Sequence, residues 1–265
     1  MKSIVYSLLV GLFVLSSCND KGVNPVVKTV LVSSYEISFG DSFISKILRR
    51  KDGYLLEQEV IGRLNDTTML SILYDSQNQT LQKKYYFTLA NGLAYKSIDS
   101  VSDSQLIAEY AYDYNVDSFC VGQQFTGKIY SDFGFQVPVT NVTGSILNEI
   151  QNNNTVQSLV EKTYTGKVNF TEKQVFIYSF LPYENVAGVQ NFSQGFKGKS
   201  NKNLIDSIEY TYFKDNVLLE SGTVMYSYVT DSVSKRILRE TQLYTSDNKD
   251  KAPVETIRNI SYPTK

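Results

Sequence analysis

The chain has 265 residues, of which 42% are hydrophobic and 20% charged, and its 26 basic and 27 acidic residues give a formal net charge of −1. This composition is typical of a globular protein with a buried core. The absence of histidine excludes Ser/His/Asp and Cys/His catalysis and histidine-bearing zinc sites, and two cysteines exclude a four-thiolate zinc site. The balanced charge offers no basic surface for nucleic acid. We therefore expect no cofactor, no metal and no nucleic-acid partner.

The N-terminus has the pattern of a secretory signal peptide. Lys2 precedes a mainly apolar run over residues 4–15, which is too short to span a bilayer as a helix. The run ends in Leu15-Ser16-Ser17-Cys18, which resembles a bacterial lipobox. We therefore predict a signal peptide at residues 1–17 and acylation of Cys18, followed by a polar tether at residues 18–26.

Residues 27–265 have the pattern of a single antiparallel β domain. The chain has 20 tyrosines and 14 phenylalanines, and turn residues punctuate β-forming segments. Asp52-Gly53, Asn91-Gly92 and Lys214-Asp215-Asn216 mark hairpin turns, because these residues tolerate a positive φ. The pattern predicts an all-β fold, an extended antiparallel meander that forms a twisted open sheet or an open barrel. Residues 145–150 fit a short helix, a strand or a loop equally well, and no other helix is expected.

Tyrosines alternate with polar residues along the most regular of these segments. In residues 105–114 the even positions are apolar or aromatic, whereas Glu109 and Asp113 stand at odd positions. Residues 204–213 and 223–230 repeat the Tyr-x-Tyr spacing. A face of this kind fits either a filled core or a binding surface. The candidate binding face consists of Tyr110, Tyr112, Tyr210, Tyr212, Tyr226 and Tyr228.

Two motifs that suggest an enzyme have simpler explanations. Gly198-Lys199-Ser200 matches the end of a phosphate-binding loop, but Ser193 stands where that loop requires glycine. Glu57 and Glu59 share one face of a predicted strand, and solvated charges on an outer face explain them more simply than a pair of glycosidase carboxylates. We therefore expect a non-enzymatic protein, with a glycan-active enzyme that uses carboxylates as an alternative of another class.

Three segments carry a family resemblance. They are the lipobox that ends at Cys18, the sequence LYDSQNQ at residues 73–79, and GFKGKSNKNL at residues 195–204, which is followed by YTY at residues 210–212. In these segments the chain resembles Bacteroidetes lipoproteins with a Tyr-rich β-sheet domain of unknown function. The resemblance implies an outer-membrane lipoprotein, on the cell surface or on the periplasmic face. It also implies possible O-glycosylation at Asp-(Ser/Thr) triplets, with Thr67, Ser100, Ser207 and Ser232 as the candidate residues.

The expected function is that of a lipid-anchored, non-enzymatic binding or structural module. Its expected partners are the membrane, through acylated Cys18, and a glycan, peptide, protein or apolar ligand on the tyrosine face. The alternative is a periplasmic carrier that shelters an apolar ligand in a curved sheet. A curved sheet around a sizeable cavity favours the carrier, whereas a filled core with an exposed tyrosine stripe favours the binding module.

Overall fold

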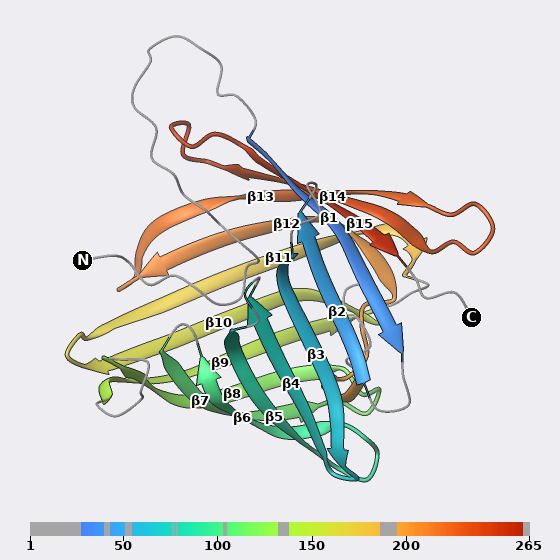
Figure 1. Ribbon diagram of the computed structural model, residues 1–265. Coiled ribbons are helices and arrows are strands. Elements are labelled where there is room, and N and C mark those ends of the chain that lie inside the picture. The colour runs from blue at the N-terminus through green and yellow to red at the C-terminus, as the bar shows by residue number, and fades with distance from the viewer. Residues whose placement is uncertain are drawn as a thin grey trace.

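The computed structural model describes residues 28–39, 43–50, 55–75, 77, 79–102, 105–131, 138–185 and 195–261. These residues form one sheet and a short 3-10 turn, η2 (Gly195–Lys197) (Figure 1). The strands of the sheet are β1 (Lys28–Phe39), β2 (Phe43–Arg50), β3 (Leu55–Asn65), β4 (Thr68–Asp75), β5 (Thr80–Thr88), β6 (Ala94–Ser102), β7 (Leu106–Tyr114), β8 (Cys120–Tyr130), β9 (Pro138–Gln151), β10 (Asn154–Gly166), β11 (Phe170–Glu184), β12 (Asn203–Lys214), β13 (Val217–Thr230), β14 (Ile237–Ser246) and β15 (Val254–Ser261). The predicted all-β fold is confirmed.

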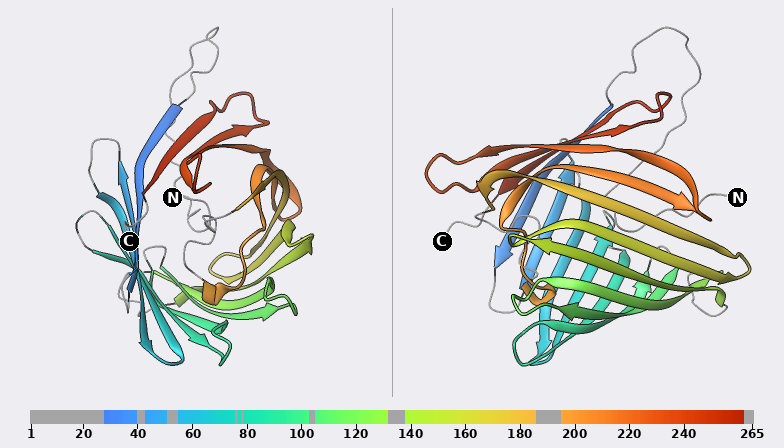
Figure 2. Two further views of the ribbon diagram at one scale, coloured as in Figure 1. Left: turned by 90° about the vertical axis from the view of Figure 1, so that its right-hand side faces the viewer. Right: turned by 180° about the vertical axis from the view of Figure 1, so that it is seen from behind.

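Each strand pairs antiparallel with the next strand along the chain, so the predicted meander is also confirmed. Residues 145–150 lie inside β9, so the short helix considered there does not form. The first and last strands pair in parallel, from Lys28 opposite Val254 to Glu36 opposite Ser261. This pairing brings the two edges of the sheet together in a barrel (Figure 2). The pairing is parallel because each hairpin reverses the chain direction, and the described strands are odd in number.

The strands β7 to β12 present a polar surface on the outside of the barrel. Leu147, Ile177 and Tyr183 interrupt it as exposed apolar or aromatic residues. The exposed polar residues along it are Glu109, Asp113, Gln124, Thr126, Lys128, Asn141, Thr143, Glu149, Glu161, Thr163, Thr165, Thr171, Lys173 and Glu209.

The inner face of the same strands carries aromatic and apolar side chains together with buried polar ones, among them Thr140, Asn154 and Ser158. Register places Ala108 opposite Gly127, which in turn lies opposite Val142, and the side chains of Ala108 and Val142 are buried. Tyr110 lies opposite Phe125, with ring centroids 5.3 Å apart. The period of two along a strand thus separates an aromatic interior from a polar exterior.

Residues 195–202, which lead into β12, lie at one mouth of the barrel and are here called the strap. The side chain of Phe196 is buried in a cluster with Ile61, Tyr86 and Ala94, and the rings of Phe196 and Tyr86 have centroids 4.8 Å apart. These partners lie in or near the β3–β4 and β5–β6 hairpins, which turn at the same mouth because alternate turns of a meander share one end.

Backbone hydrogen bonds hold the strap to two further turns at this mouth. The amide of Lys199 donates to the carbonyl of Ser118 at 2.9 Å, and the amide of Lys202 donates to the carbonyl of Asn153 at 2.9 Å. Gly198 has a φ of +101°, and a Cβ at this position would lie 2.7 Å from the carbonyl oxygen of Ser118. The close approach of the strap to the β7–β8 turn therefore requires glycine here.

Candidate functional site in the barrel interior

The six candidate tyrosines lie on the inner face of the barrel. Tyr110 and Tyr112 belong to β7, and Tyr112 packs against the cluster that contains Phe196 of the strap. The other four belong to the adjoining strands β12 and β13. Only Tyr210 is buried, with 9% of its surface exposed, and the other five are half-buried. The structure therefore gathers the tyrosines on one surface but in two groups.

A buried ion pair lies beside the first group. Lys84 Nζ is 3.2 Å from Asp99 Oδ1, and their side chains are 13% and 3% exposed. The same ammonium lies 3.9 Å from the centre of the Tyr110 ring, a cation–π distance. Burial raises the pKa of Asp99, and the charge of Lys84 offsets only part of this effect. Sequence reasoning missed this pair, although the Asn91-Gly92 hairpin, once its register is known, places the two residues opposite each other.

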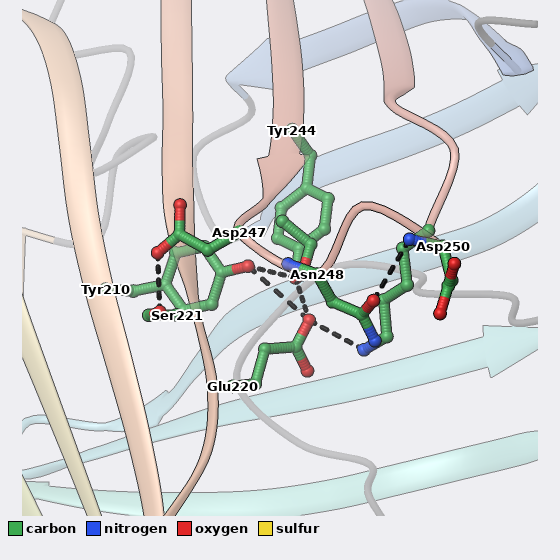
Figure 3. Close-up of polar contacts among 9 residues, drawn as sticks. Tyr210, Glu220, Ser221, Tyr244, Asp247, Asn248 and Asp250 are labelled. Atoms are coloured by element: carbon green, nitrogen blue, oxygen red, sulfur yellow. Dashed lines mark hydrogen bonds and ion pairs between the residues drawn. The ribbon is translucent and has the colours of Figure 1, made fainter. Parts of the chain in front are cut away.

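Glu220 organises a second cluster (Figure 3). It lies near the β12–β13 turn, at the mouth opposite the strap. Tyr244 Oη donates to Glu220 Oε1 at 2.5 Å, Tyr210 Oη donates to the same oxygen at 3.5 Å, and Lys251 Nζ is 2.8 Å away. The two hydroxyl groups also hydrogen-bond to each other, and their rings stack with centroids 5.3 Å apart. Burial acts to raise the pKa of Glu220, but hydrogen bonds from Lys251 and Tyr244 outweigh it, so the pKa lies below its usual value. Glu220 is therefore an ionised acceptor.

Glu172 of β11 repeats this arrangement. Tyr212 Oη donates to Glu172 Oε1 at 2.9 Å, and Tyr164 Oη donates to Glu172 Oε2 at 3.0 Å. Lys162 Nζ lies 3.9 Å from the carboxylate. Register places Tyr212 opposite Glu220, so the two carboxylate clusters are continuous across β10 to β14. We call this set the rim belt, and it consists of Tyr164, Glu172, Tyr210, Tyr212, Glu220 and Tyr244.

The tyrosine hydroxyl groups of the interior act as neutral donors. Burial raises the pKa of Tyr210 to about 12. Burial also raises the pKa values of Tyr110 and Tyr112, and for Tyr164 and Tyr244 the adjacent carboxylates add to the effect of burial. Near neutral pH the belt thus combines ring surfaces and phenol donors with the ionised carboxylate of Glu220, and Lys162 and Lys251 lie beside it. Such a set can bind a ligand that has both an apolar face and hydrogen-bonding groups.

No protein-family model matches the chain, and no curated protein matches it. Among solved structures, the chain is similar to a porin-like protein from Bacteroides vulgatus, with a TM-score of 0.50 and 14% identity over 84% of this chain and 95% of that one. A porin-like protein from Bacteroides uniformis aligns with a TM-score of 0.38 and 11% identity, over 79% of this chain and 86% of that one. The first likeness is to the fold alone, and it agrees with the expected β-rich protein.

The remaining predicted site residues lie away from the interior belt. Thr67 is in the exposed β3–β4 turn, where its amide and hydroxyl group both donate to Asn65 Oδ1. Ser232 is exposed in the turn after β13, whereas Ser100 and Ser207 lie within strands. Cys18 lies outside the described residues, and so do the signal peptide and the tether.

Two further features are absent from the described ranges. Within them, no three His, Cys, Asp or Glu side chains are grouped so that they could hold a metal ion. No helix in the same ranges is long and apolar enough to span a bilayer. The side chains of Glu57 and Glu59, the carboxylates considered for a glycosidase, lie outside the described part.

Proposed function

We propose that this protein is a lipid-anchored, non-enzymatic barrel that binds a small amphipathic molecule in its tyrosine-lined interior. The observation that supports this function best is the distribution of side chains between the two faces. Aromatic residues face inward and polar residues face outward along β7 to β12. Of the two alternatives raised by the sequence, this distribution favours the carrier, because it places no candidate tyrosine in an outward stripe.

The interior supplies both parts of an amphipathic binding surface. Tyr226 and Tyr228 are half-buried and stack with centroids 6.3 Å apart, so part of their ring surface is accessible. Tyr228 Oη donates to the carbonyl of Ile205, which fixes the position of this ring. The rim belt adds carboxylate acceptors at the opposite mouth from the strap. Ordered rings bind an apolar face with little loss of side-chain entropy, since tyrosine has few rotatable bonds.

Binding of an apolar fluorescent dye tests the interior directly. The predicted mature chain, residues 18–265 with Cys18→Ala, is expected to bind N-phenyl-1-naphthylamine saturably. Tyr226→Ala/Tyr228→Ala is expected to weaken binding by about tenfold or more, because each aromatic contact contributes roughly 1 kcal/mol. The measurement is a fluorescence titration at constant protein concentration.

The control for this titration lies on the same strand. Met225 and Val229 flank the two tyrosines in β13 but are exposed on the outer face, 54% and 51%. Met225→Ala/Val229→Ala is expected to leave the dye affinity unchanged. Non-saturable binding to the unsubstituted chain, or an equal loss of affinity in both double variants, would contradict an interior site.

The anchor is the second part of the proposed function, and it rests on the lipobox. Several acyl chains on Cys18 would attach the protein to a membrane without any contact between the barrel and lipid. The tether of residues 18–26 would then hold the barrel in the aqueous space next to the outer membrane.

Metabolic labelling with an alkyne-bearing fatty acid, combined with intact-protein mass spectrometry, tests the anchor. The natural chain is expected to carry acyl groups on an N-terminal Cys18, and Cys18→Ala is expected to lose the label. Protease treatment of whole cells then distinguishes the cell surface from the periplasmic face. A mature N-terminus without lipid would refute the proposed anchor.

A further inference from the structure

A polar cavity lies between the strap and the barrel wall, at the mouth opposite the rim belt. Its volume is about 190 Å³. Half of the residues that line it come from the strap, and the others come from β8, β9, β10 and the turn before β8. The lining residues are Lys197, Lys199, Ser200 and Asn201 of the strap with Phe119, Cys120, Asn148 and Thr155 of the wall.

Hydrogen bonds fix the shape of this cavity. Thr155 donates its amide to Asn201 Oδ1 at 2.7 Å, which ties the strap to β10. Asn148 Nδ2 donates to the carbonyl of Cys120 at 2.9 Å, and Asn148 Oδ1 accepts from Ser158 Oγ at 2.7 Å. The side chains of Asn148 and Asn201 are thus held before any ligand arrives, which lowers the entropy cost of binding.

The charge of the cavity is positive. Two of its lining residues are lysines, and among the described residues that line it there is no carboxylate. The nearby carboxylate of Asp99 interacts with Lys197, but it is already paired with Lys84 at 3.2 Å. Two lysines in a lining that has no carboxylate among its described residues give a positive potential that attracts an anion. The Nζ atom of Lys199 lies 5.9 Å from the Phe119 ring, at the cavity wall.

We propose that this cavity binds the phosphate group of a small phosphorylated molecule. A phosphate monoester carries a charge of about −1.5 to −2 and three acceptor oxygens, which matches two lysines and the hydroxyl group of Ser200. The site is unlike a nucleotide-binding loop, because the strap continues into β12 rather than into a helix. It is also independent of the proposed interior ligand, since neither lysine belongs to the rim belt.

Calorimetric titration with inorganic phosphate at constant ionic strength tests this site in the predicted mature chain with Cys18→Ala. We expect one saturable site, which Lys199→Gln weakens by about tenfold or more because it removes a charge-assisted contact. Lys202→Gln is the matched control. This lysine is exposed on the same strap and does not line the cavity, so its substitution is expected to leave phosphate affinity unchanged.

Alkylation of Cys120 provides a second measurement, made first on the protein with both cavity lysines intact. Cys120 is the remaining thiol in the Cys18→Ala chain, and it lines the cavity. Phosphate is expected to slow its reaction with iodoacetamide, and this protection is expected to disappear in Lys199→Gln. Absence of phosphate binding, absence of protection, or an equal effect of Lys202→Gln would each overturn the proposal. Dye binding in the interior is expected to be unchanged by Lys199→Gln, which separates this site from the proposed function.

Discussion

Above about pH 10 the barrel is expected to lose stability steeply, because its interior tyrosines keep their protons in the folded state. In the unfolded chain a tyrosine ionises near pH 10. Burial raises the folded-state pKa of Tyr210 to about 12 and raises those of Tyr110, Tyr112, Tyr212 and Tyr244 as well. Their contribution to stability is therefore fully present below pH 10. It falls as the pH rises further, because the folded state then binds more protons than the unfolded state.

The expected loss is large on the scale of protein stability. For each tyrosine that remains protonated only when folded, the free energy of unfolding falls by up to about 1.4 kcal/mol per pH unit above pH 10. Solvent screening reduces this value for half-buried rings. Three such residues are nevertheless enough to remove several kcal/mol from the free energy of unfolding, which for native proteins is about 5–15 kcal/mol.

Thermal unfolding from pH 8 to pH 12, followed together with tyrosinate absorbance, measures this effect. The absorbance reports tyrosine alone, since the chain has no tryptophan. Tyr112→Phe is expected to make the alkaline loss less steep, whereas Tyr183→Phe, 66% exposed, is expected to leave it unchanged. If all tyrosines ionised near pH 10 while the barrel stayed folded, the raised pKa values of the interior tyrosines would be contradicted.

Asp99→Asn is expected to destabilise the barrel by about 3–5 kcal/mol, because it leaves the charge of Lys84 in the wall without its carboxylate. The cation–π contact of Lys84 with Tyr110 offsets only part of this cost. Denaturant unfolding of the mature chain measures the change. The double variant Lys84→Met/Asp99→Leu is expected to recover most of the loss, since it removes both charges and fills the same space with apolar atoms.

An ion pair on the outer face of the neighbouring hairpin is the control. Lys96 Nζ lies 2.7 Å from Glu109 Oε1, and the two side chains are 33% and 53% exposed. Glu109→Gln is expected to cost less than about 1 kcal/mol, because water screens an exposed pair. Equal losses for Asp99→Asn and Glu109→Gln would show that the inner pair is as well solvated as the outer one.

Local sequence signals predicted the hairpins where the backbone itself demands particular residues. Gly92 has a φ of +81° in the β5–β6 turn, and Asp215 and Asn216 have φ values of 50° and 63° between β12 and β13. The Ser221-Gly222 pair looks like a similar signal, yet β13 continues through it. A Cβ on Gly222 would collide with the hydroxyl group of Tyr210, so this glycine serves packing rather than a turn.

From the sequence, the candidate site could be predicted only as one side of the tyrosine-bearing strands. Alternation along the chain placed Tyr210 and Tyr212 on one side of a strand, but their carboxylate partners Glu220 and Glu172 come from the two adjacent strands. These contacts depend on the register between strands, and a shift by one residue would turn each side chain to the other face. No local pattern distinguishes these two glutamates from solvated charges.

The sequence by itself determined the all-β class, the antiparallel meander and the alternation of tyrosines with polar residues, since each follows from the two-residue period of a strand and from turn chemistry. Only the tertiary structure decided which face points inward, the pairing of β1 with β15, and the place of the strap. Phe196 meets Tyr86 across more than a hundred residues of chain, and Lys28 meets Val254 across most of it. Such contacts form when the whole sheet curves and its apolar face leaves water, a property of all the strands together that no single segment contains.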